Sequence, residues 1–275
     1  YGLDYDPERE ITVASGATEA LASALYGLLN PGDRVVVFEP VYDLYVPVTR
    51  RAGATVDVLP LREPDFSLPL EALRETVSDE TDLIVLNHPH NPTGRMFSRE
   101  ALEALVEIGV RHDVVFLCDE VYEHLYFDET APHRPLATIE GARDRTLWIG
   151  SAGKTFNATG WKVGWACGPP HLTRALRLAH QFTTYATATP LQEALASFLH
   201  DSNVTDYLEE YRSQYRRRRR LLIDALDASP FDRVESQGTY FLLAGVPDRM
   251  LPEGDRPDRK LVRQLIEEHR VAAIP

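Results

Sequence analysis

The stretch Ser151-Ala-Gly-Lys-Thr-Phe-Asn-Ala-Thr-Gly-Trp-Lys-Val-Gly-Trp165 decides the fold, and it directly follows an apolar, strand-like run at residues 146–150. A lysine in a tight, glycine-containing turn just past a strand end is placed as a nucleophile, because its neutral amine can form a Schiff base with an aldehyde. Ser151 and Lys154 are three residues apart, so one helical turn can hold both on the same side. Lys162 lies beyond the turn, where it can bind a phosphate as a point charge. The alternative is an ordinary loop with two solvated lysines.

Strand-like and helix-like patterns alternate along the chain on both sides of this stretch. The expected strands are residues 10–14, 34–40, 53–60, 82–87, 113–118, 146–150 and 163–168. The expected helices between them are residues 19–30, 68–77, 98–110 and 171–182. This alternation predicts an α/β fold with a mostly parallel sheet and helices on both faces. We expect a large domain over residues 1–190. A connecting helix follows, and we expect it to break at Asn203 and Val204. The chain then ends in a small domain with a helix at 260–269 and a strand at 271–274.

The turn Gly16-Ala17-Thr18 precedes the first long helix. The first N–H groups of a helix have no partner within the helix, and the helix dipole favours an anion beside them. The turn is therefore a candidate phosphate site. The alternative is an ordinary helix start that is capped by the side chain of Ser15 or Thr18.

Three further polar or aromatic segments follow expected strands. Asp119 stands at the carboxyl end of a buried strand, where open α/β sheets place their ligands. A carboxylate there can keep a pyridinium N–H protonated, although a helix cap or an ion pair is the simpler explanation. Tyr42 can stack on a planar ring, or it can belong to the core or an interface. The loop 87–94 contains two X-Pro bonds, either of which can be cis. His88 and His90 have a spacing that metal ligands use, but we interpret them as loop histidines.

Composition and charge exclude several classes of function. The 275 residues are 44% hydrophobic and 26% charged, as in a globular protein with a sizeable core. A net charge of −13 argues against nucleic acid or an anionic membrane as a partner. The arginine run 216–220 lies in a long helical pattern and predicts a solvated helix face. Cys118 and Cys167 lack metal-site spacing. No apolar run is long enough to span a membrane and no signal peptide is seen, which predicts a cytoplasmic protein.

Together these motifs resemble those of the class I and II aminotransferases, the fold-type I enzymes that use pyridoxal phosphate. The family pattern Ser-x-x-Lys followed by Gly-x-(Arg or Lys)-x-Gly matches 151–164, and Asn-x-Pro-x-Asn-Pro-x-Gly matches 87–94. The resemblance is strongest to the branch of kynurenine–oxoglutarate transaminase, glutamine transaminase K and methionine aminotransferases. It implies a seven-stranded, mostly parallel sheet and a small α+β domain. It also implies that an N-terminal arm, part of the small domain and the arginine that binds the substrate carboxylate are missing from this chain.

The resemblance assigns a role to each motif. It implies that Lys154 carries the cofactor as a Schiff base and later moves the substrate Cα proton, and that Asp119 pairs with the pyridinium nitrogen. Asn91 and Tyr122 donate to the phenolic oxygen of the ring. Tyr42 stacks on the ring, and Asn87 lines the substrate side. The expected phosphate-binding residues are Gly16, Ala17, Thr18, Ser151 and Lys162.

The implied reaction moves an amino group from an L-amino acid to a 2-oxo acid by a ping-pong mechanism. The expected donors are aromatic, sulfur-containing or glutamine-like amino acids. Transamination of N-succinyldiaminopimelate and β-elimination at cysteine conjugates remain open, because they use the same residues. A cofactor-binding regulator without turnover is a further alternative, but no DNA-binding segment is seen. The resemblance also implies a homodimer with its active site at the interface, to which Tyr45 and residues 185–189 are expected to contribute.

Overall fold

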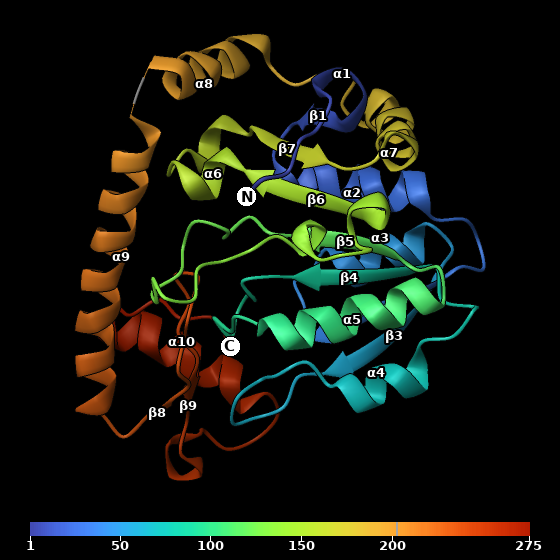
Figure 1. Ribbon diagram of the computed structural model, residues 1–275. Helices are drawn as coiled ribbons and strands as arrows, with labels where there is room; N and C mark the ends of the chain where they lie inside the picture. Colours follow the sequence, from blue (N-terminus) through green and yellow to red (C-terminus); the bar gives the residue numbers. More distant parts are fainter. Residues whose placement is uncertain (202) are drawn as a thin grey trace.

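The computed structural model describes residues 1–201 and 203–275, and a seven-stranded sheet lies at its centre (Figure 1). The strand order is β1-β7-β6-β5-β4-β2-β3. The strands are β1 (Ile11–Ala14), β2 (Arg34–Glu39), β3 (Thr55–Pro60), β4 (Leu83–Asn87), β5 (Val115–Asp119), β6 (Thr146–Ser151) and β7 (Gly164–Cys167). Only β7 runs antiparallel to its neighbours, β1 and β6, so the expected mostly parallel sheet of seven strands is confirmed.

Helices cover both faces of this sheet, as the alternation of patterns predicts (Figure 1). The helices of the described residues are α1 (Pro7–Glu10), α2 (Ala17–Leu28), α3 (Tyr45–Arg51), α4 (Leu70–Thr76), α5 (Arg99–Arg111), α6 (Ala152–Thr155), α7 (Pro170–Thr183), α8 (Thr189–Asp201), α9 (Val204–Asp227) and α10 (Pro257–His269). One buried apolar cluster packs α4 and α5 on the sheet, and a second packs α2 and α7 on the opposite face. The central strand β4 is buried at all five positions, because helices cover it from both sides.

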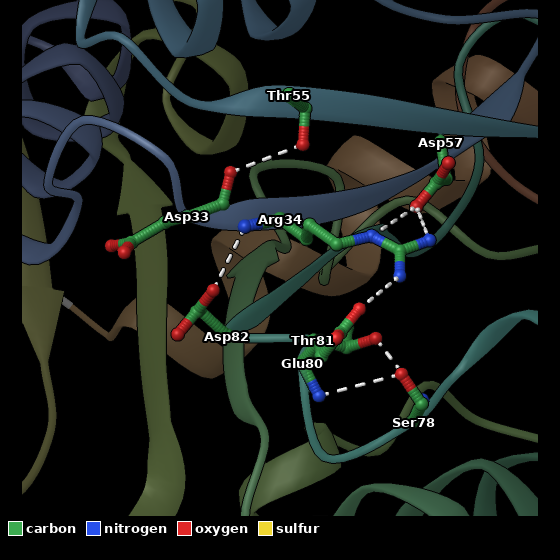
Figure 2. A network of polar contacts seen from close by, with 8 residues as sticks. All are labelled: Asp33, Arg34, Thr55, Asp57, Ser78, Glu80, Thr81 and Asp82. Carbon is green, nitrogen blue, oxygen red and sulfur yellow. Dashed lines mark hydrogen bonds and ion pairs between the residues drawn. The ribbon is translucent and has the colours of Figure 1, made fainter.

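The amino ends of β2, β3 and β4 are fixed by a polar network (Figure 2). The Arg34 guanidinium donates to Asp57 at 2.8 Å and to Glu80 at 3.2 Å, and the Arg34 backbone N–H donates to Asp82 at 2.8 Å. The same contacts tie neighbouring strands together in register, with Arg34 opposite Thr55. This network lies at the end of the sheet where these strands begin, so the opposite, carboxyl ends are left for ligand binding.

The break between α8 and α9 lies at the predicted place. The Asn203 side chain accepts from the Asp206 N–H and thereby caps α9. The arginine run lies on α9 and contacts the protein itself: Arg216 pairs with Glu129 at 2.6 Å, and Arg219 donates to the Ser236 carbonyl at 2.6 Å. The expected solvated face is therefore only partly solvated. The division into domains at residue 190 stays a prediction.

The structure differs from the sequence analysis at two places, one near residue 271 and one in the large part of the chain. Residues 271–274 form no strand, and Val271 and Ile274 are exposed. A strand needs a neighbour with which to exchange hydrogen bonds, and no described residue offers one at this place. Instead, β8 (Asp232–Arg233) and β9 (Ala244–Gly245) form a short antiparallel pair. The second correction is α3, a helix directly after Tyr42 that the sequence analysis did not anticipate.

Candidate active site

A cavity of about 240 Å³ opens at the carboxyl ends of the parallel strands, where such sheets bind ligands. It brings together residues that are far apart in the sequence. All but one of the expected site residues line it: Gly16, Ala17, Thr18, Tyr42, Asn91, Asp119, Tyr122, Ser151, Lys154 and Lys162. Ser15, Leu21, Val121, Gly153, Thr159, Val163, Tyr240 and Phe241 complete the wall.

The turn before α2 has the features of an anion site. Gly16 occupies the N-cap position at φ 85°, a conformation that suits glycine, and no side chain caps the helix. The alternative of a cap by Ser15 or Thr18 is therefore wrong. Since the first-turn N–H groups have no capping side chain and line the cavity, they are free to bind the oxygen atoms of a phosphate.

Two residues of the lysine stretch lie beside this turn. Ser151 caps the short helix α6 by accepting from the Gly153 N–H at 3.2 Å, and Lys154 lies in that same helix. One helical turn therefore holds both Ser151 and Lys154, as expected. Lys162 adopts the left-handed conformation at φ 54° and approaches Gly16: a Cβ built on Gly16 would lie 3.7 Å from the Lys162 Cα. The Ser151 hydroxyl and the Lys162 ammonium thus lie with the backbone turn 16–18 at one end of the cavity, and this end favours anions.

Asp119, at the end of β5, favours a positively charged group, whereas the turn 16–18 favours an anion. Its carboxylate is 5% exposed, and its Oδ2 accepts from the Tyr45 hydroxyl at 2.5 Å. Its Oδ1 is buried and has no hydrogen-bond partner among the described residues. Burial raises the pKa of Asp119, while the Tyr45 hydroxyl, the Val121 backbone and the charge of Lys154 act in the opposite direction. A buried carboxylate oxygen without a partner is costly, and a ring N–H would supply the missing donor.

The loop after β4 positions Asp119 and Asn91. Asn87 donates to the Asp119 carbonyl at 2.8 Å, and its Oδ1 accepts from the Asn91 N–H at 2.6 Å. Asn87 therefore lies behind the cavity wall rather than in it, and it is the one expected site residue that does not line the cavity. Both X-Pro bonds of this loop, His88–Pro89 and Asn91–Pro92, are cis.

The two loop histidines are enclosed by protein. His88 and His90 are each 2% exposed, and no group of three or more His, Cys, Asp or Glu residues in the described chain is arranged to hold a metal ion. His90 contacts the Thr93 hydroxyl at 2.9 Å and hydrogen-bonds to the Pro40 backbone. The interpretation of both as structural loop residues agrees with these contacts.

Aromatic side chains surround the lysine amine. Lys154 Nζ donates to the Tyr240 hydroxyl at 2.9 Å, and the Tyr122 hydroxyl donates to the same oxygen at 3.3 Å. Burial raises the pKa of Tyr122, so its hydroxyl keeps its proton. Tyr240 is absent from the expected site. Its only signal in the sequence is its place in the turn Gly238-Thr-Tyr-Phe241, which lies between the short strands β8 and β9 and does not follow a strand of the main sheet.

The structure also corrects the role of Tyr45. Its ring is 3% exposed and packs edge-on against Tyr42 at 5.6 Å, and its hydroxyl is bound to Asp119. Such a residue cannot reach a partner chain, so the expectation of an interface residue is wrong. Tyr185 is 79% exposed whereas Thr187 is 5% exposed, and the interface expected at 185–189 stays a prediction.

No helix in the part of the chain that the structure describes has both the length and the apolar character needed to cross a membrane.

Comparison with known proteins identifies the family. All residues, 1–275, match the family model "Aminotransferase class I and II". The probable N-succinyldiaminopimelate aminotransferase DapC of Mycobacterium tuberculosis is 44% identical over 278 residues, which cover 100% of this chain and 68% of the relative. The kynurenine–oxoglutarate transaminase of Dictyostelium discoideum is 34% identical over 305 residues, covering 100% of this chain and 70% of the relative.

Two solved structures have the same fold. That of N-succinyldiaminopimelate aminotransferase from Mycobacterium tuberculosis has a TM-score of 0.93 and 43% identity, and it is matched over 100% of this chain and 70% of its own. That of YbdL from Escherichia coli, described as a methionine aminotransferase, has a TM-score of 0.92 and 34% identity, with 100% and 71% covered. The chain therefore belongs to the class I and II aminotransferases, fold-type I enzymes that depend on pyridoxal phosphate.

Proposed function

We propose that this chain moves an amino group between an L-amino acid and a 2-oxo acid at the cavity around Lys154, and that N-succinyldiaminopimelate is its amino donor. The observation that carries the reaction is the pairing of a lysine amine with the unpartnered buried Oδ1 of Asp119 in one cavity. When bound, pyridoxal phosphate supplies an aldehyde for the lysine and a ring that accepts the electrons released at the substrate Cα.

The protein's own residues have separate tasks in this reaction. Lys154 attaches the cofactor and, once freed by the substrate amine, takes up the Cα proton as a general base. Asp119 accepts a hydrogen bond from the ring nitrogen and stabilises its positive charge, and Tyr45 and Asn87 hold Asp119 in place. Tyr45 contacts the carboxylate and Asn87 contacts the backbone carbonyl, so the side chain and the main chain of Asp119 are held by different elements before the ligand binds.

The other lining residues orient the cofactor. The turn 16–18, Ser151 and Lys162 bind its phosphate, and Tyr42 stacks on the ring. Asn91 and Tyr122 donate to its phenolic oxygen. Lys162 stands where the family pattern allows arginine or lysine, and lysine binds the phosphate as a point charge instead of a bidentate fork.

The choice of donor rests on relatedness. The N-succinyldiaminopimelate aminotransferases are 43–44% identical to this chain, whereas the kynurenine and methionine enzymes are 34–37% identical. Donors of the aromatic, sulfur-containing and glutamine-like classes are the alternatives, and β-elimination at cysteine conjugates is the alternative reaction. All of them use Lys154 and Asp119 in the same way, so the substrates themselves must decide.

The first experiment identifies the attached lysine. The protein is loaded with pyridoxal phosphate, reduced with borohydride, digested and analysed by mass spectrometry. The sequence contains three lysines, and we expect the adduct on Lys154 alone. Lys154→Ala should lose the visible absorbance band of the lysine-bound cofactor. Lys260→Ala is the matched control, because Lys260 donates to the Glu253 carbonyl outside the cavity and should leave the band unchanged.

The second experiment identifies the donor. The loaded protein is mixed with N-succinyldiaminopimelate, kynurenine, methionine or glutamine, and the rate at which the band converts to that of the amine form of the cofactor is recorded. We expect the fastest conversion with N-succinyldiaminopimelate. A faster conversion with another donor would reassign the substrate, and pyruvate release from a cysteine conjugate without conversion would reassign the reaction.

We further propose a homodimer. Phe182 and Tyr185 near the end of α7 are 84% and 79% exposed, and large exposed aromatic side chains are typical of interfaces. Sedimentation of the loaded protein should give the mass of two chains, and a single chain at micromolar concentration would contradict the proposal.

A further inference from the structure

Tyr240 reaches the lysine amine from a distant part of the chain. Its hydroxyl oxygen lies 2.9 Å from Lys154 Nζ, although the two residues are 86 positions apart in the sequence. The same oxygen accepts from the Tyr122 hydroxyl at 3.3 Å. Both neighbours donate in this arrangement, so the proton of the Tyr240 hydroxyl is not used by either contact.

The ring of Tyr240 is held by other aromatic rings. Tyr122 packs edge-on against it at 5.3 Å, Phe241 lies at 4.7 Å, and Tyr215 of α9 stacks on it at 6.2 Å. Tyr211, one turn before Tyr215, donates to the Lys154 carbonyl at 2.7 Å. Helix α9 therefore fixes the tyrosine and the lysine backbone relative to each other, and the contact between hydroxyl and amine is built into the fold.

A hydroxyl suits a base that changes its protonation state. An ammonium only donates, and the Tyr240 oxygen accepts from it; a neutral amine has a lone pair, to which the Tyr240 O–H can donate. The lysine of an aminotransferase alternates between these two states each time it takes up and releases a proton. A phenylalanine ring would fill the same space but would offer neither contact.

We propose that Tyr240 is a further residue of the catalytic machinery, which holds the Lys154 amine in both protonation states while that amine transfers the substrate proton. This inference rests on the proposed function, because it requires Lys154 to be the reacting amine. The simpler explanation is that Tyr240 only packs against its aromatic neighbours. That explanation predicts no effect of removing the hydroxyl while the ring remains.

The test compares two substitutions that each remove one hydroxyl. Tyr240→Phe removes the contact with Lys154, and Tyr215→Phe removes a hydroxyl that contacts Asn157 at 3.2 Å but leaves the stacked ring. In the loaded enzyme, we expect the rate of the half-reaction to fall about tenfold in Tyr240→Phe, the size of effect for a partly solvated hydrogen bond to a charged group. Cofactor affinity should stay within about twofold, and Tyr215→Phe should match the wild type in both.

A second measurement does not depend on turnover. In the full chain without cofactor, the amine-directed acylation of Lys154 is followed by mass spectrometry from pH 7 to 10. The Tyr240 hydroxyl occupies one hydrogen-bonding position of the amine at 2.9 Å, and that contact must break before the amine attacks the reagent. Its removal should therefore raise the acylation rate of Lys154 by about threefold or more. Lys260 in the same samples is the internal control.

The outcomes separate the two proposals. Unchanged acylation and an unchanged half-reaction in Tyr240→Phe, with the cofactor still attached to Lys154, would overturn the role of Tyr240 alone. A cofactor attached to another lysine, or to none, would overturn the proposed function and this inference with it. A slower half-reaction together with faster acylation supports the role of Tyr240.

Discussion

A methyl group on Gly164 would press against the turn that we assign to the cofactor phosphate. A Cβ built at this position lies 2.6 Å from the Ala17 nitrogen, 2.7 Å from the Gly16 carbonyl carbon and 3.0 Å from the Gly150 carbonyl oxygen. All three are backbone atoms, which cannot rotate away. Gly164→Ala therefore forces either β7 or the phosphate turn to move.

The size of the effect follows from these distances. To bring the closest contact back to about 3.4 Å, the backbone atoms must separate by about 0.8 Å. The turn 16–18 borders the cavity, so it has room to move, whereas β7 is paired on both sides. Overpacking of this kind costs about 1–3 kcal/mol. We expect about 1.4 kcal/mol of that, a factor of about ten, to appear as weaker phosphate binding.

The assay measures the contribution of the phosphate directly. The dissociation constants of pyridoxal phosphate and of pyridoxal are measured by absorbance titration, and their ratio is compared between variants. Gly164→Ala should reduce this ratio about tenfold, because only the phosphate ester uses the turn. Gly160→Ala is the matched control from the same motif, since a Cβ built there meets no atom within 4 Å.

Thermal unfolding of the chain without cofactor accompanies the titration, because it shows whether Gly164→Ala is folded. A folded Gly164→Ala with the same preference for the phosphate ester as the wild type would refute the assignment of the turn 16–18. An equal loss in Gly160→Ala would refute the steric reasoning, because no contact predicts it.

Three further predictions concern one residue that lines the cavity and two that are buried outside its wall. Asp119→Asn should keep the absorbance band of the attached cofactor but lose about a hundredfold or more in kcat, because breaking a buried pair costs about 3–5 kcal/mol. Tyr45→Phe removes the hydrogen bond that lowers the pKa of Asp119, so the acidic limb of the pH–rate profile should move to higher pH. Burial lowers the pKa of His90 to about 4. The unfolded chain then binds a proton that the folded chain does not, so the unfolding free energy should fall by roughly 3 kcal/mol at most between pH 6.5 and 4, and His90→Gln should flatten this part of a urea-unfolding profile.

The main sheet could be predicted from the sequence because each of its strands carries a local signal. Four of the five buried positions of β4 form one apolar run and the fifth is Asn87, and polar residues at strand ends mark the edge where ligands bind. The predicted strand at 271–274 shows the limit of this reasoning. An apolar run of four residues predicts a strand only if a neighbour exists, and the existence of a neighbour is a property of the fold and not of the run.

The site was predictable to the extent that its residues stand in motifs next to strands. Lys154, Asp119 and Asn91 each follow a strand of the same sheet, so their proximity follows from the topology. Tyr45 and Tyr240 lie outside such motifs. Tyr45 reaches Asp119 because the unanticipated helix α3 directs it into the core, and Tyr240 reaches Lys154 through the packing of α9. Such contacts depend on tertiary packing, to which a tyrosine in a short turn gives no local clue.

The arrangement of charge in the cavity limits what can bind there and in which direction. One end consists of N–H groups, a hydroxyl and an ammonium, and it favours an anion. The other end is a buried carboxylate oxygen that no described residue hydrogen-bonds, and it favours a donor that carries positive charge. A ligand with a phosphate at one end and a protonated ring nitrogen at the other satisfies both, and the reversed orientation satisfies neither. Because the two ends lie on different elements, α2 and β5, the orientation is set by the fold before the Lys154 amine forms any covalent bond.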